Sequence, residues 1–426
     1  MSEWKKATLA EIADIRVSNV DKKSNQGEKP VMLCNYMDVY SNDYITRDIS
    51  FMEATANIME IAKFTVSKGD VLITKDSETP FDIGIPAVVV DDMDNLVCGY
   101  HLAQIKPDER KVDSIFLAKL LSMPKVVSYF SSLAAGSTRY GLSNKTIANT
   151  VVSLPPLDIQ KNISRILRNI DKAIEKTDLL INKYRDIRRG LLHDLLVRGI
   201  DSDERLRSSY EIRPDLYKKT VIGWIPKEWT VRTLGDLTES WAMGPRFSSD
   251  EYDENGNVAT LRTTDISKDG NINYPTMPIA KLNLLGMNNH ILQKNDFVIT
   301  RSGTCGICAV FEGFRLPVLP GAFLIRFRFK KEIIPNYIAY YLNSDLGSPS
   351  VARLAEGGVQ KNLRGTSLCT INIPIPSYEE QELILRKINA IDHKIKTETD
   401  SRKILESKRK GLTSDLLSPE ISVNLY

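Results

Sequence analysis

Two long stretches of the chain carry apolar residues at every third or fourth position. The first follows Pro155-Pro156, starts at Asp158, stops at Gly199 and has as its apolar positions Ile159, Ile163, Ile166, Ile170, Ile174, Ile181, Tyr184, Ile187, Leu191 and Leu195. The second is closed by Pro419 and has as its apolar positions Ile384, Ile388, Ile391, Ile395, Leu405, Leu412 and Leu416. This spacing places them on one face of an α-helix. The sequence predicts two helices of about 40 residues, each about 60 Å long at a rise of about 1.5 Å per residue.

A helix of this length cannot be buried inside one globule, so its apolar stripe needs another long helix as a partner. Two direct repeats related by a rotation lay the helices antiparallel, with a globule at each end. The residues predicted to pair the helices are Ile163, Ile170, Ile174, Ile181 and Leu191 in the first and Ile384, Ile391, Ile395, Leu405 and Leu412 in the second. The alternative, that each helix packs on its own globule, stays open at this point.

Two local features of these helices predict further detail. Ser377 and Glu380 have the spacing of a capping box, in which the hydroxyl accepts a free amide proton and the carboxylate returns to the cap residue. Gly190 and Gly411 occupy equivalent places inside the helices. Because an interior glycine costs about 1 kcal/mol relative to alanine, they indicate either a close backbone contact or fraying of the helix end.

The proline turn and the helix after it occur twice. Leu154, Pro155 and Gln160 fall on Ile375, Pro376 and Gln381 at a shift of 221 residues, since 376 − 155 = 221. Upstream, Trp4 and Leu9 match Trp229 and Leu234 at a shift of 225, and residues 68–75 match residues 294–301 at a shift of 226. The segments between these anchors differ. Self-similarity at a fixed spacing determines architecture, so the chain is organised as globule, helix, globule, helix.

Within each globule, short β-like runs alternate with turns, and a helix precedes the proline turn. The β-like runs are Val71–Thr74, Pro86–Val90, Phe297–Thr300 and Phe323–Phe329, and the helices are Ser114–Leu121 and Tyr337–Leu342. The predicted fold class is α+β with an antiparallel sheet. The predicted division is globule 1–157, helix 158–199, linker 200–224, globule 225–377, helix 378–418 and tail 419–426.

Composition narrows the function classes. A chain of 426 residues is long enough for two to three domains. Its 57 Lys and Arg against 54 Asp and Glu give a formal charge of +3, so a polyanion has to be met by local patches. The apolar runs are too short to cross a bilayer and the start of the chain lacks a secretion signal, so we expect a cytoplasmic protein.

The motifs of common enzymes are missing from the sequence. It has no GxGxxG after a strand and no GxxxxGK[ST] loop, and its four histidines form no HExxH pair. The five cysteines are an odd number that fits reduced thiols, and Cys305-Gly-Ile-Cys308 lacks the further ligands of a closed zinc site. We interpret the run Asp108 to Lys111 as a solvated charge cluster rather than a nuclease site. These observations favour binding over catalysis and predict no metal or cofactor in this chain.

Three pairs of polar loops fall at equivalent places in the two globules. They are residues 74–77 with 300–304, residues 136–142 with 357–364, and residues 35–38 with 262–265. Such side chains, with aromatic residues nearby, supply phosphate contacts and hydrogen bonds to base edges. The candidate DNA-binding residues are Asn35, Tyr36, Lys75, Ser77, Arg139, Tyr140, Lys145, Arg262, Thr263, Arg301, Ser302, Gln360, Lys361 and Arg364.

The order of these motifs, together with the tandem repeat, resembles the specificity subunit of Type I restriction-modification systems. The resemblance rests on Leu-Pro-Pro-Leu-Asp-Ile-Gln (154–160), Ile-Pro-Ile-Pro-Ser-Tyr-Glu-Glu-Gln (373–381), Lys-Gly-Asp-Val-Leu-Ile-Thr (68–74) and Thr-Arg-Ser-Gly-Thr (300–304). It implies two target recognition domains that each read one half of a bipartite, asymmetric DNA site. It also implies helices that fix the gap and dock modification subunits, expected to be two.

The same resemblance places the chemistry in partner chains. The modification subunit would carry S-adenosylmethionine and methylate adenine, and the restriction subunit would use ATP and Mg²⁺. Half-sites about one helical turn apart, roughly 34 Å, suit one face of the duplex, and methylation requires a flipped base. The first globule departs from the second in having Lys75-Asp76-Ser77 and four more residues before its glycine (84 − 75 = 9 against 306 − 301 = 5). Two alternatives remain, a coiled-coil adaptor between proteins and a nuclease or methyltransferase with an unrecognised site.

Overall fold

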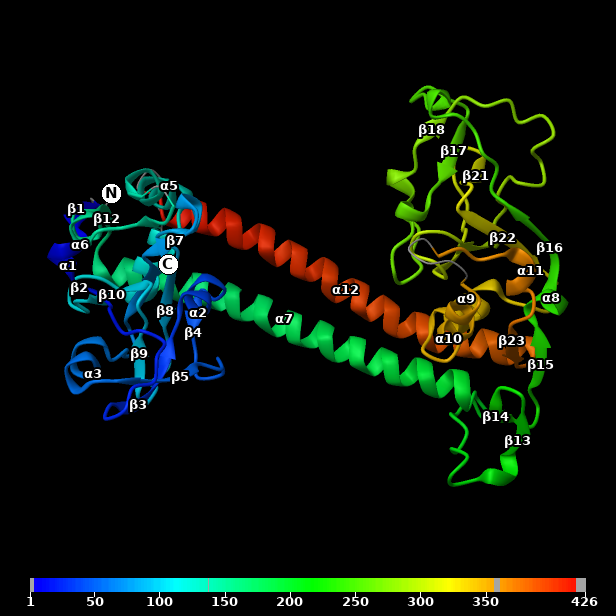
Figure 1. Ribbon diagram of the computed structural model, residues 1–426, viewed down its shortest axis with the longest axis horizontal. Helices are drawn as coiled ribbons and strands as arrows, with labels where there is room; N and C mark the ends of the chain where they lie inside the picture. Colours follow the sequence, from blue (N-terminus) through cyan, green and yellow to red (C-terminus); the bar gives the residue numbers. More distant parts are fainter. Residues whose placement is uncertain (1–3, 137, 356–360, 419–426) are drawn as a thin grey trace. The chain divides into compact units, whose positions relative to one another are not determined.

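A computed structural model describes residues 4–136, 138–355 and 361–418 (Figure 1). The chain divides into two compact units. The first unit comprises residues 1–179 and 399–426, and the second comprises residues 180–398. Each unit therefore contains one globule and a length of both long helices.

The first globule contains a five-stranded and a three-stranded sheet. The five-stranded sheet has the order β2 (Ala13–Val17), β10 (Leu102–Pro107), β6 (Val71–Thr74), β8 (Pro86–Val89) and β4 (Tyr44–Ile45). The three-stranded sheet has the order β5 (Met52–Ala56), β3 (Lys29–Cys34) and β9 (Leu96–Cys98). Two short pairs complete it, namely β1 (Lys5–Thr8) with β12 (Val151–Leu154) and β7 (Asp76–Ser77) with β11 (Tyr140–Gly141). Its helices are α1 (Leu9–Ile12), α2 (Tyr36–Tyr40), α3 (Ile58–Phe64), η1 (Pro80–Asp82), α4 (Ser114–Leu121), α5 (Pro124–Leu133) and α6 (Asn144–Ala148).

The second globule repeats this plan with one strand fewer in its larger sheet. One sheet has the order β16 (Thr238–Met243), β22 (Leu324–Phe329), β19 (Phe297–Thr300) and β20 (Cys308–Val310), and the other has the order β18 (Ile279–Ala280), β17 (Val258–Leu261) and β21 (Val318–Pro320). The short pairs are β15 (Thr230–Thr233) with β23 (Asn372–Ile375) and β13 (Tyr217–Thr220) with β14 (Gly223–Pro226). Its helices are α8 (Leu234–Leu237), α9 (Pro335–Asn343), α10 (Ser348–Arg353) and α11 (Gly365–Leu368), with 3-10 turns η2 (Pro214–Leu216), η3 (Ser249–Glu251), η4 (Thr263–Asp265) and η5 (Tyr274–Thr276).

The predicted α+β class is confirmed, and each globule contains the predicted antiparallel sheet, but parallel pairs that the sequence analysis did not predict are also present. β3 pairs with β9 in parallel, and β17 pairs with β21 in parallel, at the same place in the two globules. β4 and β8 form a further parallel pair in the first globule. A parallel pair needs a long connection between its strands. Here the intervening chain builds three of the five strands of the other sheet in the first globule and two of the four in the second. The alternation of buried and exposed side chains along a strand does not show whether the neighbouring strand runs parallel or antiparallel to it.

The glutamine of each proline turn ties the globule to its long helix. The Gln160 amide donates to Pro155 O at 2.8 Å and to Lys111 O at 3.3 Å, and its carbonyl oxygen accepts from Asp113 N at 3.0 Å. In the second copy the amide of Gln381 donates to Pro376 O at 3.3 Å and Glu332 O at 3.2 Å, and its carbonyl accepts from Ile334 N at 2.9 Å. Every partner lies at the shift of 221 residues that the sequence shows.

A buried carboxylate at the start of the central strand is also repeated. Asp70 precedes β6 and accepts hydrogen bonds from Gln104 at 2.8 Å and Lys106 at 2.9 Å. Asp296 precedes β19 and accepts two hydrogen bonds from Arg328, at 2.8 Å and 3.0 Å. A buried charge is tolerated when it is paired and hydrogen-bonded, and in each globule the cation comes from the neighbouring strand, β10 or β22.

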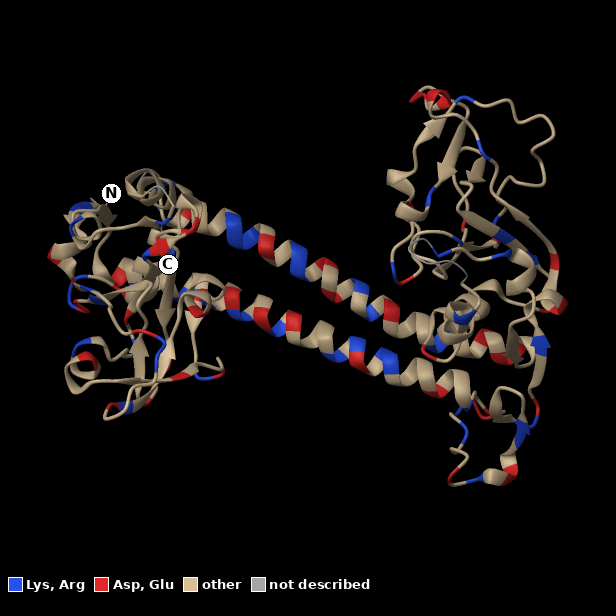
Figure 2. Cartoon of the chain, viewed as in Figure 1, with Lys and Arg blue, Asp and Glu red and all other residues tan. Residues whose placement is uncertain are grey.

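The long helices α7 (Leu157–Val197) and α12 (Tyr378–Leu416) pair antiparallel within each unit, so this part of the predicted fold is confirmed. In the second unit Arg188 pairs with Asp392, and in the first unit Arg402 pairs with Asp178 and Arg409 with Asp171. The residue numbers of each pair add to the same total (188 + 392, 402 + 178 and 409 + 171 all give 580), as a constant antiparallel register requires. Charged residues of both signs occur along both helices (Figure 2).

The predicted pairing residues are buried to different degrees. Ile163, Ile174, Ile181, Ile384 and Ile391 are buried, and Ile170, Leu191, Ile395, Leu405 and Leu412 are half-buried. Ile163 and Ile384 lie in clusters that also contain core residues of the globules, so the first turns of each helix pack on their own globule. Ile187, which the apolar pattern includes, is 45% exposed.

Two detailed expectations for the helices are wrong. A Cβ atom added at Gly190 or Gly411 would meet nothing within 4 Å, and both helices continue past these residues, so they mark neither a close contact nor a frayed end. Glu380 N does donate to Ser377 Oγ at 3.2 Å, but the Glu380 carboxylate does not return to the cap. It accepts instead from Trp229 Nε1 at 3.0 Å, Ile200 N at 2.8 Å and Arg207, because these buried donors need a hydrogen-bond acceptor.

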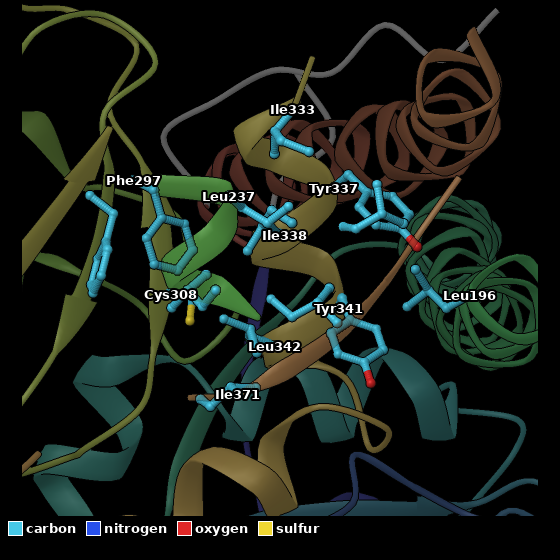
Figure 3. Packing of buried hydrophobic residues seen from close by; sticks show 14 of the residues in the cluster. Leu196, Leu237, Phe297, Cys308, Ile333, Tyr337, Ile338, Tyr341, Leu342 and Ile371 are labelled. Carbon is cyan, nitrogen blue, oxygen red and sulfur yellow. The ribbon is translucent and has the colours of Figure 1, made fainter. Parts of the chain in front are cut away.

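The core of the second unit joins the globule to both helices. Tyr337 and Ile338 of α9 and Phe297 of β19 pack in one buried cluster with Leu196 of α7 (Figure 3). Ile384 and Ile388 of α12 belong to the same cluster. The first unit has an equivalent cluster in which Phe116 of α4 packs with Ile163 and Leu167. In the part of the chain that the structure describes, no helix is long and apolar enough to span a membrane.

Candidate nucleic-acid interface

The end of the central strand has the same backbone construction in both globules. The Thr74 hydroxyl accepts from Ile85 N at 3.0 Å, and the Thr300 hydroxyl accepts from Ile307 N at 2.9 Å. Gly84 N donates to Thr74 O and Gly306 N donates to Thr300 O, each at 2.8 Å. Both glycines have positive φ, +76° and +93°, which favours glycine over residues with a Cβ atom. The four extra residues of the first globule therefore lengthen only the turn between fixed ends.

Two of the three predicted loop pairs lie together in space. In the first globule Ser77 pairs with Tyr140 and Asp76 with Gly141 across β7 and β11. In the second globule Ser302 forms the equivalent bridge with Asn362, and Leu363 N donates to Arg301 O at 2.9 Å. We call these regions the first tip, made of residues 75–77, 100–101 and 139–140 with Tyr36, and the second tip, made of residues 301–302, 323 and 361–362 with Met243.

The first tip contains a chain of charged side chains. Lys75 Nζ lies 2.5 Å from Asp76 Oδ2, and His101 Nδ1 lies 3.4 Å from the same oxygen. Arg139 Nη2 lies 3.5 Å from His101 Nε2. Burial, and less strongly the nearby Arg139, lowers the pKa of His101, while its contact with Asp76 opposes that shift. The exposed guanidinium of Arg139 ends this chain at the surface, whereas Lys75 is buried.

Aromatic side chains surround the same place. The Lys75 ammonium lies 5.3 Å from the centre of the Tyr100 ring, and Tyr100 packs edge-on against His101. The Tyr36 hydroxyl donates to Asp82 O at 3.1 Å and its ring stacks on Tyr40. Burial raises the pKa of Tyr36. The phenol therefore remains a hydrogen-bond donor at neutral pH.

The second tip has the same backbone but different chemistry. Arg301 Nε donates to Asn362 Oδ1 at 3.2 Å, and Arg301 Nη1 contacts Met243 Sδ. Arg301 N donates to Phe323 O at 2.8 Å, as Lys75 N donates to His101 O at 2.8 Å. Phe323 is 53% exposed. An arginine beside an exposed aromatic ring thus replaces the Lys-Asp-His-Arg chain of the first tip.

In the third predicted loop pair, each loop contains an aspartate that accepts a hydrogen bond from the backbone N–H at the start of the same loop. Asn35 N donates to Asp38 Oδ2 at 2.7 Å, and Arg262 N donates to Asp265 Oδ2 at 2.8 Å. Arg262 also donates to Asp265 through Nε at 3.1 Å and Nη2 at 2.9 Å. Asp265 is buried, so the ion pair between Arg262 and Asp265 shapes the loop. The neighbouring Thr263 is half-buried. A role for Asn35, Arg262 or Thr263 in DNA contact stays a prediction.

Of three further candidate residues, two lie apart from the paired strands and one lies outside the described residues. Lys145 is exposed on α6, next to the first tip in sequence. Arg364 is exposed at the start of α11. Gln360 lies outside the described residues, and Lys361, beside it, is exposed within the second tip. The contact roles of all these residues stay predictions.

The sequence interpretation overlooked Tyr100, His101, Phe323 and Met243 as members of the tips, and it placed Asp76 and Asn362 in the predicted loops without choosing them as DNA-binding residues. His101 and Phe323 are equivalent at a shift of 222, which extending the internal alignment would have shown. Their residue types share no chemistry, so a search by motif passes over them. Met243 reaches the second tip from β16, far away in sequence.

Cys305 and Cys308 are surrounded by packed residues and backbone carbonyls rather than by metal ligands. Cys308 is buried in β20, and the Cys305 thiol donates to Arg301 O at 3.0 Å and Lys361 O at 3.2 Å. Burial raises the pKa of both thiols. Across residues 4–136, 138–355 and 361–418, no group of three or more His, Cys, Asp or Glu side chains is arranged to hold a metal ion.

Each tip offers a small set of fixed donors and acceptors with an aromatic face. Arginine and lysine donate to phosphate or to guanine, and aspartate and asparagine can accept from the amino groups of bases. The aromatic rings add surfaces for apolar contact with bases or sugars. The arrangement suits recognition of nucleic acid, and its differences between the two tips suit two different sequences.

Comparison with known proteins gives a consistent result over nearly the whole chain. The family model of the Type I restriction modification DNA specificity domain matches residues 1–182 and again residues 226–407. A putative type I restriction enzyme MjaX specificity subunit of Methanocaldococcus jannaschii is 24% identical over 425 residues, covering 99% of this chain and 94% of the relative. The MjaVIII specificity subunit of the same organism is 23% identical over 412 residues, covering 93% and 90%.

Solved structures share the fold. The crystal structure of the S subunit of a Type I restriction-modification system from M. genitalium has a TM-score of 0.60 at 18% identity, covering 98% of this chain and 97% of that chain. A structure described as the basis of complex assembly and conformational transition of the type I R-M system has a TM-score of 0.53 at 15% identity, covering 98% of both chains.

Proposed function

We propose, because the chain belongs to the family of Type I restriction modification DNA specificity domains, that it selects the DNA sequence for a restriction-modification complex and catalyses no reaction itself. Each globule acts as a target recognition domain and reads one half of a bipartite site. The two half-sites differ in sequence, so the site is asymmetric. The coiled-coil helices set the gap of unread base pairs between the half-sites.

One observation supports this proposal most strongly. The two globules have the same frame, with equivalent hydrogen bonds at Gln160 and Gln381 and equivalent buried carboxylates at Asp70 and Asp296. Their tips carry different side chains on the same backbone. A duplicated support that presents two different binding surfaces is what recognition of two unlike DNA sequences requires. An enzyme with one active site has no need of this duplication.

The catalytic partners and their cofactors belong to this proposal. The helices dock modification subunits, expected to be two, that carry S-adenosylmethionine and methylate adenine. A restriction subunit uses ATP and Mg²⁺. Because adenine in a duplex is out of reach of a methyltransferase, the bound DNA is distorted and the target base is flipped into the pocket of the modification subunit.

Methylome sequencing of a host that expresses this chain with its modification partner tests the proposal. The expected result is one methylated motif made of two different specific sequences separated by a gap of fixed length. A host with the modification partner but without this chain is the control and should lack the motif. A continuous motif, or methylation that is independent of this chain, contradicts the proposal.

Salt dependence distinguishes DNA recognition from a protein adaptor. A DNA-binding subunit neutralises phosphates and releases counterions, so its affinity for a duplex falls steeply as salt concentration rises. An adaptor that only joins proteins binds duplex DNA weakly at every salt concentration. The measurement is a salt titration of the complex of this chain with its modification subunits on a duplex that contains the mapped motif.

A further inference from the structure

Each unit contains a junction in which an aspartate, an arginine and a side chain from the globule connect that globule to both long helices. In the second junction, the Tyr340 hydroxyl of α9 donates to Asp392 Oδ2 of α12 at 3.0 Å. Arg188 of α7 donates to both oxygens of the same carboxylate. In the first junction, Asp171 of α7 lies 2.9 Å from Lys119 Nζ of α4 and 3.6 Å from Arg409 Nη1 of α12.

The two junctions are copies of one arrangement. Tyr340 is equivalent to Lys119 (340 − 119 = 221), Asp392 to Asp171 (392 − 171 = 221) and Arg409 to Arg188 (409 − 188 = 221). The aspartate and the arginine are the same in both copies, whereas the side chain from the globule changes from lysine to tyrosine. Lys119 contacts Asp171 and Tyr340 contacts the equivalent Asp392, so the contact is repeated although the residue type from the globule differs.

The junctions lie one helical turn beyond the apolar attachment of each globule. Ile384 and Ile388 pack in the core of the second unit, and Asp392 follows four residues later on α12. Ile163 and Leu167 pack in the core of the first unit, with Asp171 four residues later on α7. Four residues of helix span about 6 Å. Each globule is therefore fixed to its helix at two separate points.

The two points constrain different motions. Apolar packing opposes separation of the globule from the helix but has no preferred direction. Charge-assisted hydrogen bonds have a defined geometry, so the junction opposes tilting about the apolar contact. Burial, and then the Asp392 carboxylate, raises the pKa of Tyr340 to about 12, so the phenol remains a donor at neutral pH. In the first junction the Tyr44 hydroxyl of β4 also donates to Asp171, at 2.6 Å.

We infer that Asp171 and Asp392 are positioning residues that fix the tilt of each globule on the helix pair, and that they thereby set the length of the gap in the DNA site. This inference rests on the proposed function. The change in tilt that matters is small. For a tip roughly 25 Å from its junction, the size of such a domain, a tilt of about 8° displaces the tip by one base-pair rise of about 3.4 Å.

The test is methylome sequencing with Asp392→Asn in the full chain, expressed with its modification partner. The readout is the methylation of sites with correct half-sites and a gap one base pair too long or too short, relative to sites with the native gap. Since a hydrogen bond to a charged group contributes enough to change an equilibrium by about tenfold or more, this ratio should rise about tenfold. Both half-site sequences should stay unchanged. Tyr340→Phe removes only one hydroxyl and should raise the ratio less, which keeps the test available should Asp392→Asn fold poorly.

Asp178→Asn is the matched control. Asp178 pairs with Arg402 across the same two helices and in the same register, but this pair includes no side chain from a globule. Its ratio should equal that of the unchanged chain. The inference is overturned when the junction variants lower methylation equally at all gap lengths, as a purely structural role requires, or when Asp178→Asn relaxes the gap as much. A native chain that gives no bipartite motif overturns the proposed function itself.

Discussion

The first and second globules share a frame and differ at their tips. Gln160 and Gln381 make the same three hydrogen bonds, and Thr74 and Thr300 close the same turn. At the tips, the first globule has a Lys-Asp-His-Arg chain, while the second has Arg301 between Asn362 and Met243 with Phe323 exposed nearby. The frame is determined by buried polar groups that must be satisfied, whereas the tips end in exposed side chains such as Arg139 and Phe323, which are free to vary.

This difference separates two kinds of experimental effect. A change in the frame should lower stability by a similar amount in either globule and leave the recognised sequence unaltered. A change at a tip should alter the recognised sequence in one half-site and leave stability nearly unaltered. The following predictions test that separation.

The buried carboxylates should show the largest effect. Asp70→Ala and Asp296→Ala each remove a buried carboxylate and leave a half-buried cation, Lys106 or Arg328, without its partner. Removing one member of a buried pair costs about 3–5 kcal/mol, so each variant should lower the free energy of unfolding by this amount in chemical denaturation. The exposed pair of Asp14 with Arg16 supplies the control, and Asp14→Ala should change little. A large loss for only one of the two frame variants contradicts the shared frame.

Arg301 should dominate recognition by the second tip. Arg301→Ala removes a fork of donors, so binding to the mapped site should weaken by about 1–3 kcal/mol and discrimination should relax in one half-site only. Competition binding with duplexes changed at single positions measures both effects. Arg213→Ala removes the same charge from the linker and should not change the preferred sequence. Equal weakening on every duplex would instead identify Arg301 as a phosphate contact.

Arg139 gives the corresponding test at the first tip. Its exposed guanidinium lies next to His101. An imidazole holds a guanidinium less strongly than a carboxylate would, so the guanidinium is available to DNA. Arg139→Ala should relax the other half-site, also by about 1–3 kcal/mol. The double variant with Arg301→Ala should show the two losses adding, because distant sites act independently. Relaxation of the same half-site by both variants is the result that opposes the assignment of one half-site to each globule.

The smallest expected effect is a pH dependence confined to the first globule. The pKa of His101 is lowered in the folded protein, so between that value and the ordinary value of 6.5 the unfolded chain binds a proton that the folded chain does not. Stability therefore falls as pH decreases through this window and is fully present above 6.5. His101→Gln should remove this part of the pH dependence of thermal unfolding. Phe323→Gln in the second globule should leave the pH dependence unchanged.

The sequence predicted what the internal repeat carries directly. The helices, the α+β class, the proline turn and the strands at residues 71–74 and 297–300 all fall on matching positions, and the structure has each of them. Periodicity also identified the buried faces of the helices near Ile174 and Ile391. Local spacing fixes such features, so one sequence is enough to find them.

Features that depend on distant segments could not be found in this way. Parallel pairing of β3 with β9 leaves no local pattern, and the Glu380 carboxylate bonds donors near residues 200 and 229 rather than its own cap. Lys119 and Tyr340 occupy equivalent positions with different side chains, so identity alone conceals their shared contact. The tips combine four segments each, and only the fold shows which of their residues meet.

Exchange of one globule tests the central claim most directly. Residues 1–157 are replaced by the matching segment of a relative with a different target, and methylated sites are mapped in a host that also expresses the modification subunit. The account predicts that one half-site changes to that of the relative, while the other half-site and the gap remain. Two unchanged half-sites, or the simultaneous change of both, would contradict it.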